Sequence, residues 1–177
     1  RRTHKYASFL RIRAPCLWRV LRYHYLLKEE DKTMAHQDKG KYFKKHPEGT
    51  KVQEDLKQEI LKQVKDNNIA CRAAEKIAQK TNATLSEIGV GIDLLNFNIV
   101  QCQLGLFGFD RNQKRVPAAE TVSPDLEAAI RKAMIDNRFS CQAAWEIADR
   151  LKIKRLDVCA ACENLKIKIK PCQLGAF

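Results

Sequence analysis

The sequence predicts a mainly α-helical protein with small β segments, in which the same three-helix unit occurs twice. Three observations indicate this fold class. Residues 52–107 align without a gap with residues 122–177, and roughly a third of the paired positions are identical. Within each copy, apolar residues recur at the spacing of helices that bury one face. A short alternating run closes each copy with the two-residue period of a half-buried strand.

The first predicted helix covers about residues 53–65 in the first copy and residues 124–135 in the second. Its apolar stripe in the first copy consists of Leu56, Ile60, Leu61 and Val64. In the second copy, Ser123 and Pro124 supply an N-cap hydroxyl and a first-turn proline, which both favour a helix start. An Asp-Asn pair is expected to end this helix in both copies.

The second predicted helix covers residues 71–80 and 141–151, and the third covers residues 85–95 and 155–165. The second helix carries an alanine pair followed by Ile-Ala in both copies. The small alanine side chains let another helix approach closely, while the isoleucine anchors the core. Because only a short turn separates the two helices, each copy contains a helix-turn-helix.

An alternating run follows the third helix, over residues 97–100 in the first copy and 166–170 in the second. It has the period of a half-buried strand, so its isoleucines are expected to face inward. Gly105 or Gly175 is then expected to turn the chain back.

The order of elements in residues 143–169 is Ala-Ala-x-x-Ile-Ala-x-x-Leu, a short turn, a helix and Leu-x-Ile-x-Ile. This order resembles the winged helix-turn-helix superfamily of transcription regulators. The resemblance implies that the third helix enters the major groove of DNA and that the wing touches the backbone or the minor groove. Two tandem winged helix-turn-helix units are therefore expected, over residues 52–107 and 122–177.

The rest of the chain divides by composition. Residues 1–33 hold nine Lys and Arg against three acids and do not begin with Met, so we expect a disordered upstream extension from an over-extended gene start, with a genuine targeting peptide as the alternative. Residues 34–51 are expected to form a basic flexible arm, and residues 108–121 a linker. No stretch reaches the roughly 18 apolar residues of a membrane span, so a cytoplasmic protein without a membrane partner is expected.

Charge distinguishes the two copies. The chain has a net charge of +12, which favours a polyanionic partner. The first copy has six basic and seven acidic residues, and its third helix contains Glu87 and Asp93 but no Lys or Arg. It is predicted to be a pairing or docking unit, for a second copy of the chain or another protein. Gly89 and Gly91 would permit close approach of a helix there, or simply weaken their own helix. The second copy, with ten basic and seven acidic residues, is predicted to bind the nucleic acid.

The predicted partner is double-stranded DNA. Its contacts are expected from the cations at the turn, at the start of the third helix and along the wing of the second copy. These are Arg150, Lys152, Lys154, Arg155, Lys166, Lys168 and Lys170.

The cysteines offer an alternative chemistry. Cys159 and Cys162 have metal-ligand spacing, and Cys141 and Cys172 would complete a four-thiolate site. However, the positions equivalent to Cys159 and Cys162 in the first copy are a glycine and an isoleucine, which indicates filler on a buried helix face. The cysteine pairs at 71/141 and 102/172 suit a packing contact between the second helix and the wing turn. We therefore predict structural thiols, no metal and no cofactor.

Nothing in the sequence indicates an enzyme. Outside residues 1–33 the only histidines are His36 and His46, and no glycine-rich phosphate loop or metalloprotease motif occurs. The predicted function is that of a DNA-binding transcription regulator. Two alternatives remain, a protein-interaction adaptor with degenerate winged helices and a cysteine-based metal or redox sensor.

Overall fold

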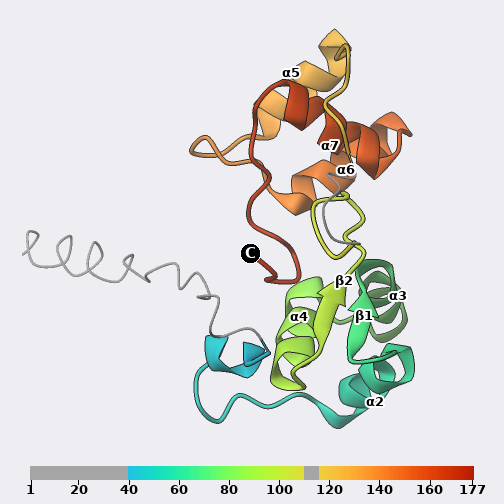
Figure 1. Cartoon of the computed structure of the whole chain (residues 1–177), viewed down its shortest axis with the longest axis vertical. Helices are drawn as coiled ribbons and strands as arrows, with labels where there is room; N and C mark the ends of the chain where they lie inside the picture. The colour runs from blue at the N-terminus through green and yellow to red at the C-terminus, as the bar shows by residue number, and fades with distance from the viewer. Residues whose placement is uncertain (1–39, 110–115) are drawn as a thin grey trace, which may run out of the picture. The chain divides into compact units, whose positions relative to one another are not determined.

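The computed structural model describes residues 40–109 and 116–177, so the predicted extension 1–33 lies outside the described residues. The described part is mainly α-helical with one two-stranded sheet (Figure 1). No helix in it is long and apolar enough to cross a membrane. The elements in chain order are η2 (Tyr42–Lys45), α2 (Glu54–Gln63), β1 (Asn68–Ala70), α3 (Cys71–Thr81), α4 (Leu85–Leu94), β2 (Asn98–Val100), α5 (Pro124–Ala133), α6 (Cys141–Leu151) and α7 (Arg155–Asn164).

The six predicted helices are confirmed, three in each repeat, with boundaries within about two residues of those expected. The predicted start of α5 is also confirmed, because the Ser123 hydroxyl accepts a hydrogen bond from the Leu126 N–H at 3.4 Å and Pro124 lies in the first turn. In α2, Leu56 and Ile60 are buried as expected. Leu61, expected on the same stripe, is exposed instead.

The repeated Asp-Asn pair forms a tight hairpin turn. Asp66 and Asn67 both have positive φ, 48° and 61°. The N–H of Lys65 donates to the Asn68 oxygen at 2.9 Å, and the Asn68 N–H donates back at 2.8 Å. Two consecutive residues of positive φ define the type I′ turn, which Asn and Asp tolerate. Residues 136–137 repeat this conformation. The Asp-Asn pair therefore recurs in both repeats because its position requires two residues of positive φ.

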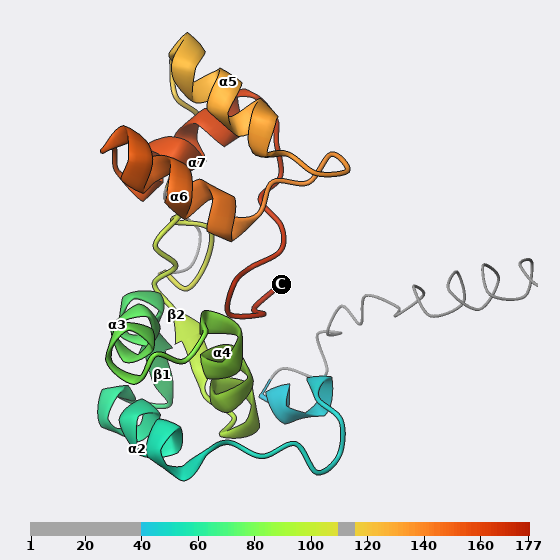
Figure 2. The same ribbon diagram turned by 180° about the vertical axis from the view of Figure 1, so that it is seen from behind.

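The small sheet differs from the expected wing. β1 was not predicted, and it pairs with β2 in parallel, with Ile69 opposite Ile99 (Figures 1 and 2). In the second repeat the equivalent pairing is a single parallel bridge between Phe139 and Ile169. The strand before the helix-turn-helix thus pairs with the strand after it. The mainly α fold with small β segments is confirmed, and the tandem winged-helix assignment stays a prediction.

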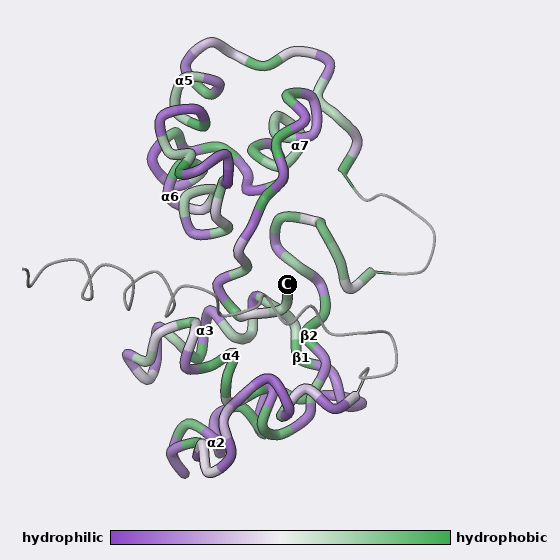
Figure 3. The backbone as a smooth tube through the Cα atoms, turned by 90° about the vertical axis from the view of Figure 1, so that its left-hand side faces the viewer, coloured by the Kyte–Doolittle hydropathy of each residue, from purple (hydrophilic) through white to green (hydrophobic). Residues whose placement is uncertain are grey.

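Each repeat buries one face of each of its helices. The core residues of the first repeat include Ile60, Ile77 and Ile88, and those of the second include Ile130 and Ile147. Figure 3 shows the resulting alternation of hydrophobic and hydrophilic stretches along the helices. The helix-turn-helix pairs α3–α4 and α6–α7 are therefore fixed to their repeats by apolar packing.

The Cys-Gln-Leu-Gly-x-Phe motif forms the same closed loop in both repeats, residues 102–107 and 172–177. In the first loop the Cys102 N–H donates to the Phe107 oxygen at 3.1 Å, and the Gly105 N–H donates to the Cys102 oxygen at 2.8 Å. The second loop has the same two bonds, at 3.3 Å and 3.1 Å. The motif glycine has positive φ in each loop, 75° and 66°, which explains the choice of glycine.

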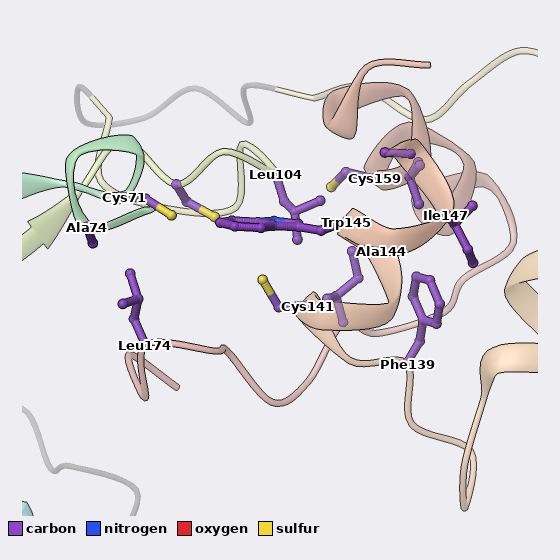
Figure 4. Close-up of a cluster of buried hydrophobic side chains, with 14 of the residues drawn as sticks. Cys71, Ala74, Leu104, Phe139, Cys141, Ala144, Trp145, Ile147, Cys159 and Leu174 are labelled. Carbon is purple, nitrogen blue, oxygen red and sulfur yellow. The ribbon is translucent and has the colours of Figure 1, made fainter. Parts of the chain in front are cut away.

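We call these two loops the clasp, because each contacts the opposite repeat. Leu104 of the first loop lies beside Trp145 of the second repeat, whereas Leu174 of the second loop lies near Ala74 of the first (Figure 4). A Cβ atom at Gly89 would lie 2.3 Å from the Leu174 oxygen, so this glycine permits close approach, but not of a helix as expected. The approaching segment is a loop of the same chain.

The clasp also contains an aromatic pair from its two loops. The rings of Phe107 and Phe177 meet edge to face with centroids 5.5 Å apart. These phenylalanines occupy the same position in the two repeats. The internal duplication therefore places equivalent residues against each other, as in a symmetric dimer interface formed within one chain.

Candidate nucleic-acid interface

The seven predicted DNA-contacting cations separate into two classes. Six of them are exposed on the second repeat: Arg150, Lys152, Lys154, Lys166, Lys168 and Lys170. Arg155 is different, because only 18% of its side chain is exposed. Arg150 lies in the last turn of α6, and the other five exposed cations lie in two segments, the α6–α7 turn and residues 166–170.

The α6–α7 turn presents the first group of exposed cations. Lys152 ends α6 with φ 55°, and the Ile153 N–H donates to the Ala148 oxygen at 3.0 Å. Lys154 then precedes α7, and its N–H donates to the Asp157 carboxylate at 3.1 Å. This three-residue turn places its partly buried isoleucine between two exposed lysines. The cations are therefore held on a rigid element.

Residues 166–170 present the second group. Lys166 has φ 57°, and the Ile167 N–H donates to the Cys162 oxygen at 2.9 Å, which ends α7. The Lys170 N–H donates to the Phe139 oxygen at 2.8 Å. Within this segment the isoleucines are buried or partly buried and the lysines are exposed, so the predicted alternation is confirmed.

Arg155 does not face solvent as the sequence suggested. Its guanidinium donates to the two carboxylate oxygens of Glu75 in the first repeat, at 3.1 Å and 2.8 Å, and to the Gln103 side-chain oxygen at 2.9 Å. It also lies 3.6 Å from the centroid of the Trp145 ring. Burial raises the pKa of Glu75, but hydrogen bonds from Arg155 and Gln103 outweigh this and lower the pKa overall. The expectation that Arg155 is a free phosphate contact is therefore corrected.

Part of the outer face of α7 is covered as well. The Ala119 N–H donates to the Ala160 oxygen at 3.0 Å, and the Asn164 side-chain amide donates to the Ala119 oxygen at 2.8 Å. Val116, also in the linker, is buried. The described end of the linker therefore lies along α7, where the sequence suggested an open recognition helix.

The segment around η2, which precedes the first repeat in the chain, covers part of α4, the third helix of that repeat. Asp93 in α4 is only 3% exposed, and it accepts hydrogen bonds from Lys45 at 3.1 Å and 3.3 Å. The His46 ring nitrogen Nε2 lies 3.1 Å from Asp93 Oδ2. The Tyr42 hydroxyl donates to the Asn98 side-chain oxygen at 2.7 Å. The segment around η2 is thus docked on the first repeat, which corrects the expected free arm for residues 42–46.

The acidic residues of α4 serve the fold. Glu87 and Thr84 form a capping box, in which the Thr84 N–H donates to the Glu87 carboxylate at 2.7 Å and the Glu87 N–H donates to the Thr84 hydroxyl at 3.2 Å. Asp93 accepts hydrogen bonds from Lys45, whose ammonium also donates to the Gly175 oxygen of the clasp at 3.1 Å. Glu87 is exposed and caps α4, whereas Asp93 is buried and paired with Lys45.

The cysteines are packing residues in this structure. Cys159 and Cys162 are each 1% exposed, which confirms their predicted position on a buried helix face. Within residues 40–109 and 116–177, no group of His, Cys, Asp and Glu side chains is arranged to hold a metal ion. The Gln173 amide lies 3.5 Å from the Cys141 sulfur, and the equivalent distance from Gln103 to Cys71 is 4.0 Å. The predicted contact between the second helix and the repeated motif is confirmed.

One thiol pair has uneven acidity. Hydrogen bonds from the Cys141 thiol and from backbone N–H groups of residues 174–176 outweigh burial and lower the pKa of Cys172. The pKa of Cys141 is raised by its hydrogen bond to Cys172 and by burial. In the first repeat, burial raises the pKa of the equivalent Cys102. Cys172 is therefore the most acidic of these three thiols.

The contacts of Glu75, Gln103 and Asp93 were not predicted from the sequence. For Glu75, the comparison of the two repeats contains a signal. Positions 75 and 155 are Glu and Arg, whereas their equivalents in the other repeat are Trp145 and Leu85. An opposite charge pair that appears once, at positions that are otherwise apolar, indicates a contact between the repeats.

Comparison of the chain with protein-family models, with characterised proteins and with solved structures gave no match.

Proposed function

We propose that the chain is a transcription regulator that binds double-stranded DNA through its second repeat. One observation supports the proposal most strongly. Five of the six exposed cations, Lys152, Lys154, Lys166, Lys168 and Lys170, lie on two short segments that flank α7, and the sixth, Arg150, lies in the last turn of α6. In the first repeat, by contrast, three of the six cations, Lys57, Lys62 and Lys80, are in ion pairs with glutamates.

The contacts we propose are with phosphates. Lysine ammonium groups on flexible stems act as point charges, and each phosphate that they neutralise releases counterions from the DNA. Such contacts fix the orientation of a protein on the duplex without reading its sequence. Arg155 is paired with Glu75, and the linker lies along part of α7. We therefore do not propose that Arg155 or the covered part of α7 reads DNA bases.

The first repeat has a supporting role in this proposal. Its charge is close to neutral, and it receives the clasp loop of the second repeat at Gly89. It also holds Arg155 through Glu75. We propose that it fixes the orientation of the second repeat's helix-turn-helix and leaves the phosphate contacts to that repeat.

A salt titration tests the proposal. The full chain is mixed with a fluorescent duplex of about 30 base pairs and random sequence, and the affinity is measured by anisotropy from about 50 to 300 mM salt. We expect the logarithm of the affinity to fall linearly with that of the salt concentration, with about 0.9 of slope for each phosphate contact. Poly-glutamate of matched charge should compete weakly. Absence of binding at the lowest salt would contradict the proposal and favour the adaptor function.

A further inference from the structure

A groove on the second repeat lies where the clasp meets the segment after α7. It encloses about 540 Å³. Its lining comes from Leu106 and Phe107 of the first clasp loop, Phe177 of the second, and Ile167 and Ile169 after α7. The volume is in the range of small-molecule sites.

The lining of this groove is largely apolar. Leu106 and Phe177 are 36% and 40% exposed, although both are large hydrophobic residues. Cys159 and Cys162 also line the groove and are almost fully buried. Covering apolar surface of this kind removes it from water, which is favourable. A ligand with an apolar body would therefore gain free energy here.

The charged residues of the groove indicate the head group of the ligand. Lys166, Lys168 and Lys170 line the same groove, together with a single carboxylate, that of Glu163. A lysine can lay its apolar stem along the lining and keep its ammonium group in water at the rim. Three cations beside an apolar hollow complement a molecule that has an anionic head and an apolar body.

We propose that this groove binds a small amphipathic anion, an organic carboxylate or sulfonate with an aliphatic or aromatic body. The body contacts Leu106, Phe107 and Phe177, so the bound ligand bridges both loops of the clasp. The head group neutralises lysines at positions 166–170. A corollary rests on the proposed function: because the same lysines are assigned to phosphates, the ligand and DNA exclude each other.

The test uses anilinonaphthalene sulfonate, a fluorescent amphipathic anion, with the full chain and no DNA, so that its outcome is independent of DNA binding. We expect saturable binding of one equivalent. Decanoate should displace the probe at a lower concentration than decanol, which has the same body but no charge. Saturation only at many equivalents, or equal displacement by the two competitors, would overturn the proposal.

Two variants locate the site. Lys168→Glu should weaken probe binding about two- to fivefold or more. The range is the effect of removing one exposed ion pair. Leu106→Ser should weaken it about tenfold, because it removes apolar surface that would cover the body of the probe. The matched controls are Lys132→Glu and Ile135→Ser, which alter an exposed lysine and an exposed isoleucine outside the groove. Equal losses of affinity in variants and controls, or unchanged binding in both groove variants with an intact circular dichroism spectrum, would contradict the assignment.

Discussion

The guanidinium of Arg155 and the carboxylate of Glu75 form a two-point ion pair that joins the second repeat to the first, with N–O distances of 3.1 Å and 2.8 Å. Two parallel hydrogen bonds of this type are geometrically specific as well as strong. The pair lies beside the clasp, since Gln103 of the first loop donates to Glu75 at 2.8 Å and accepts from Arg155. The residue that the sequence suggested for DNA thus fixes one repeat against the other.

Arg155→Ala should lower the free energy of unfolding by about 1–3 kcal/mol, between the values for exposed and buried pairs. The reason is that Glu75 would lose its ion-pair partner while remaining half-buried, and the stacking on Trp145 would disappear. Urea unfolding followed by tryptophan fluorescence measures the change. Arg150→Ala, which removes an exposed arginine from the same region, is the control and should have little effect.

The Glu75 pair should make stability depend on pH. Because the folded protein lowers the pKa of Glu75, its carboxylate contributes stability above the usual carboxyl pKa, and this contribution is lost as the pH falls through the folded-state pKa. Glu75→Gln removes the charge but keeps the shape. The melting temperature of this variant should lie below that of wild type at pH 7, and the difference should shrink at about pH 4 and below. A constant difference across this range would exclude the ion pair as its cause.

Gly89→Ala should disrupt the clasp. The added Cβ would meet the backbone oxygen of Leu174 at 2.3 Å, and backbone cannot move away as a side chain can. We expect the free energy of unfolding to fall by about 1–3 kcal/mol, the range for overpacked sites. Gly91→Ala, in the same helix, is the comparison, because its Cβ would meet only the end of the Ile60 side chain at 2.8 Å. If Gly91→Ala destabilises the protein more, the close approach at Gly89 is not a stabilising contact.

Cys172 should react with iodoacetamide faster than its equivalent Cys102. Hydrogen bonds lower the pKa of Cys172, and it is partly exposed, whereas Cys102 is buried and its pKa is raised. The thiolate is the reactive form, so the lower pKa gives Cys172 a larger thiolate fraction than Cys102 at neutral pH. Mass spectrometry of tryptic peptides after short labelling gives the site-specific rates. Cys141→Ala should slow labelling at Cys172 because it removes the hydrogen bond that stabilises the thiolate.

Local patterns in the sequence predicted the helices because each helix depends on neighbouring residues. The spacing of Leu56 and Ile60 in α2, the Ser123 cap and the alanine pairs are all short-range signals, and the structure confirms them. The burial of Cys159 and Cys162 was predicted from the duplication alone, since their equivalents are a glycine and an isoleucine.

Long-range contacts could not be predicted in this way. The partner of Arg155 lies 80 residues away, and that of Lys45 lies 48 residues away. Neither separation has a periodic signature, so the sequence alone predicts Arg155 as a DNA contact. β1 was missed because a three-residue strand with one buried side chain carries almost no pattern. The parallel pairing of β1 could not be predicted either, because its partner β2 lies beyond α3 and α4 in the chain.

The most direct test of the proposed function compares two triple variants of the full chain in the DNA salt titration. One replaces Lys166, Lys168 and Lys170 by glutamine, and the other replaces Lys57, Lys62 and Lys80. Both remove the same charge, but only the first set is assigned to phosphates. We predict that the second-repeat variant binds more weakly and that its salt slope falls by about 0.9 for each phosphate that it no longer neutralises, while the first-repeat variant keeps nearly the wild-type slope. Equal slopes for the two variants would contradict the assignment of DNA binding to the second repeat.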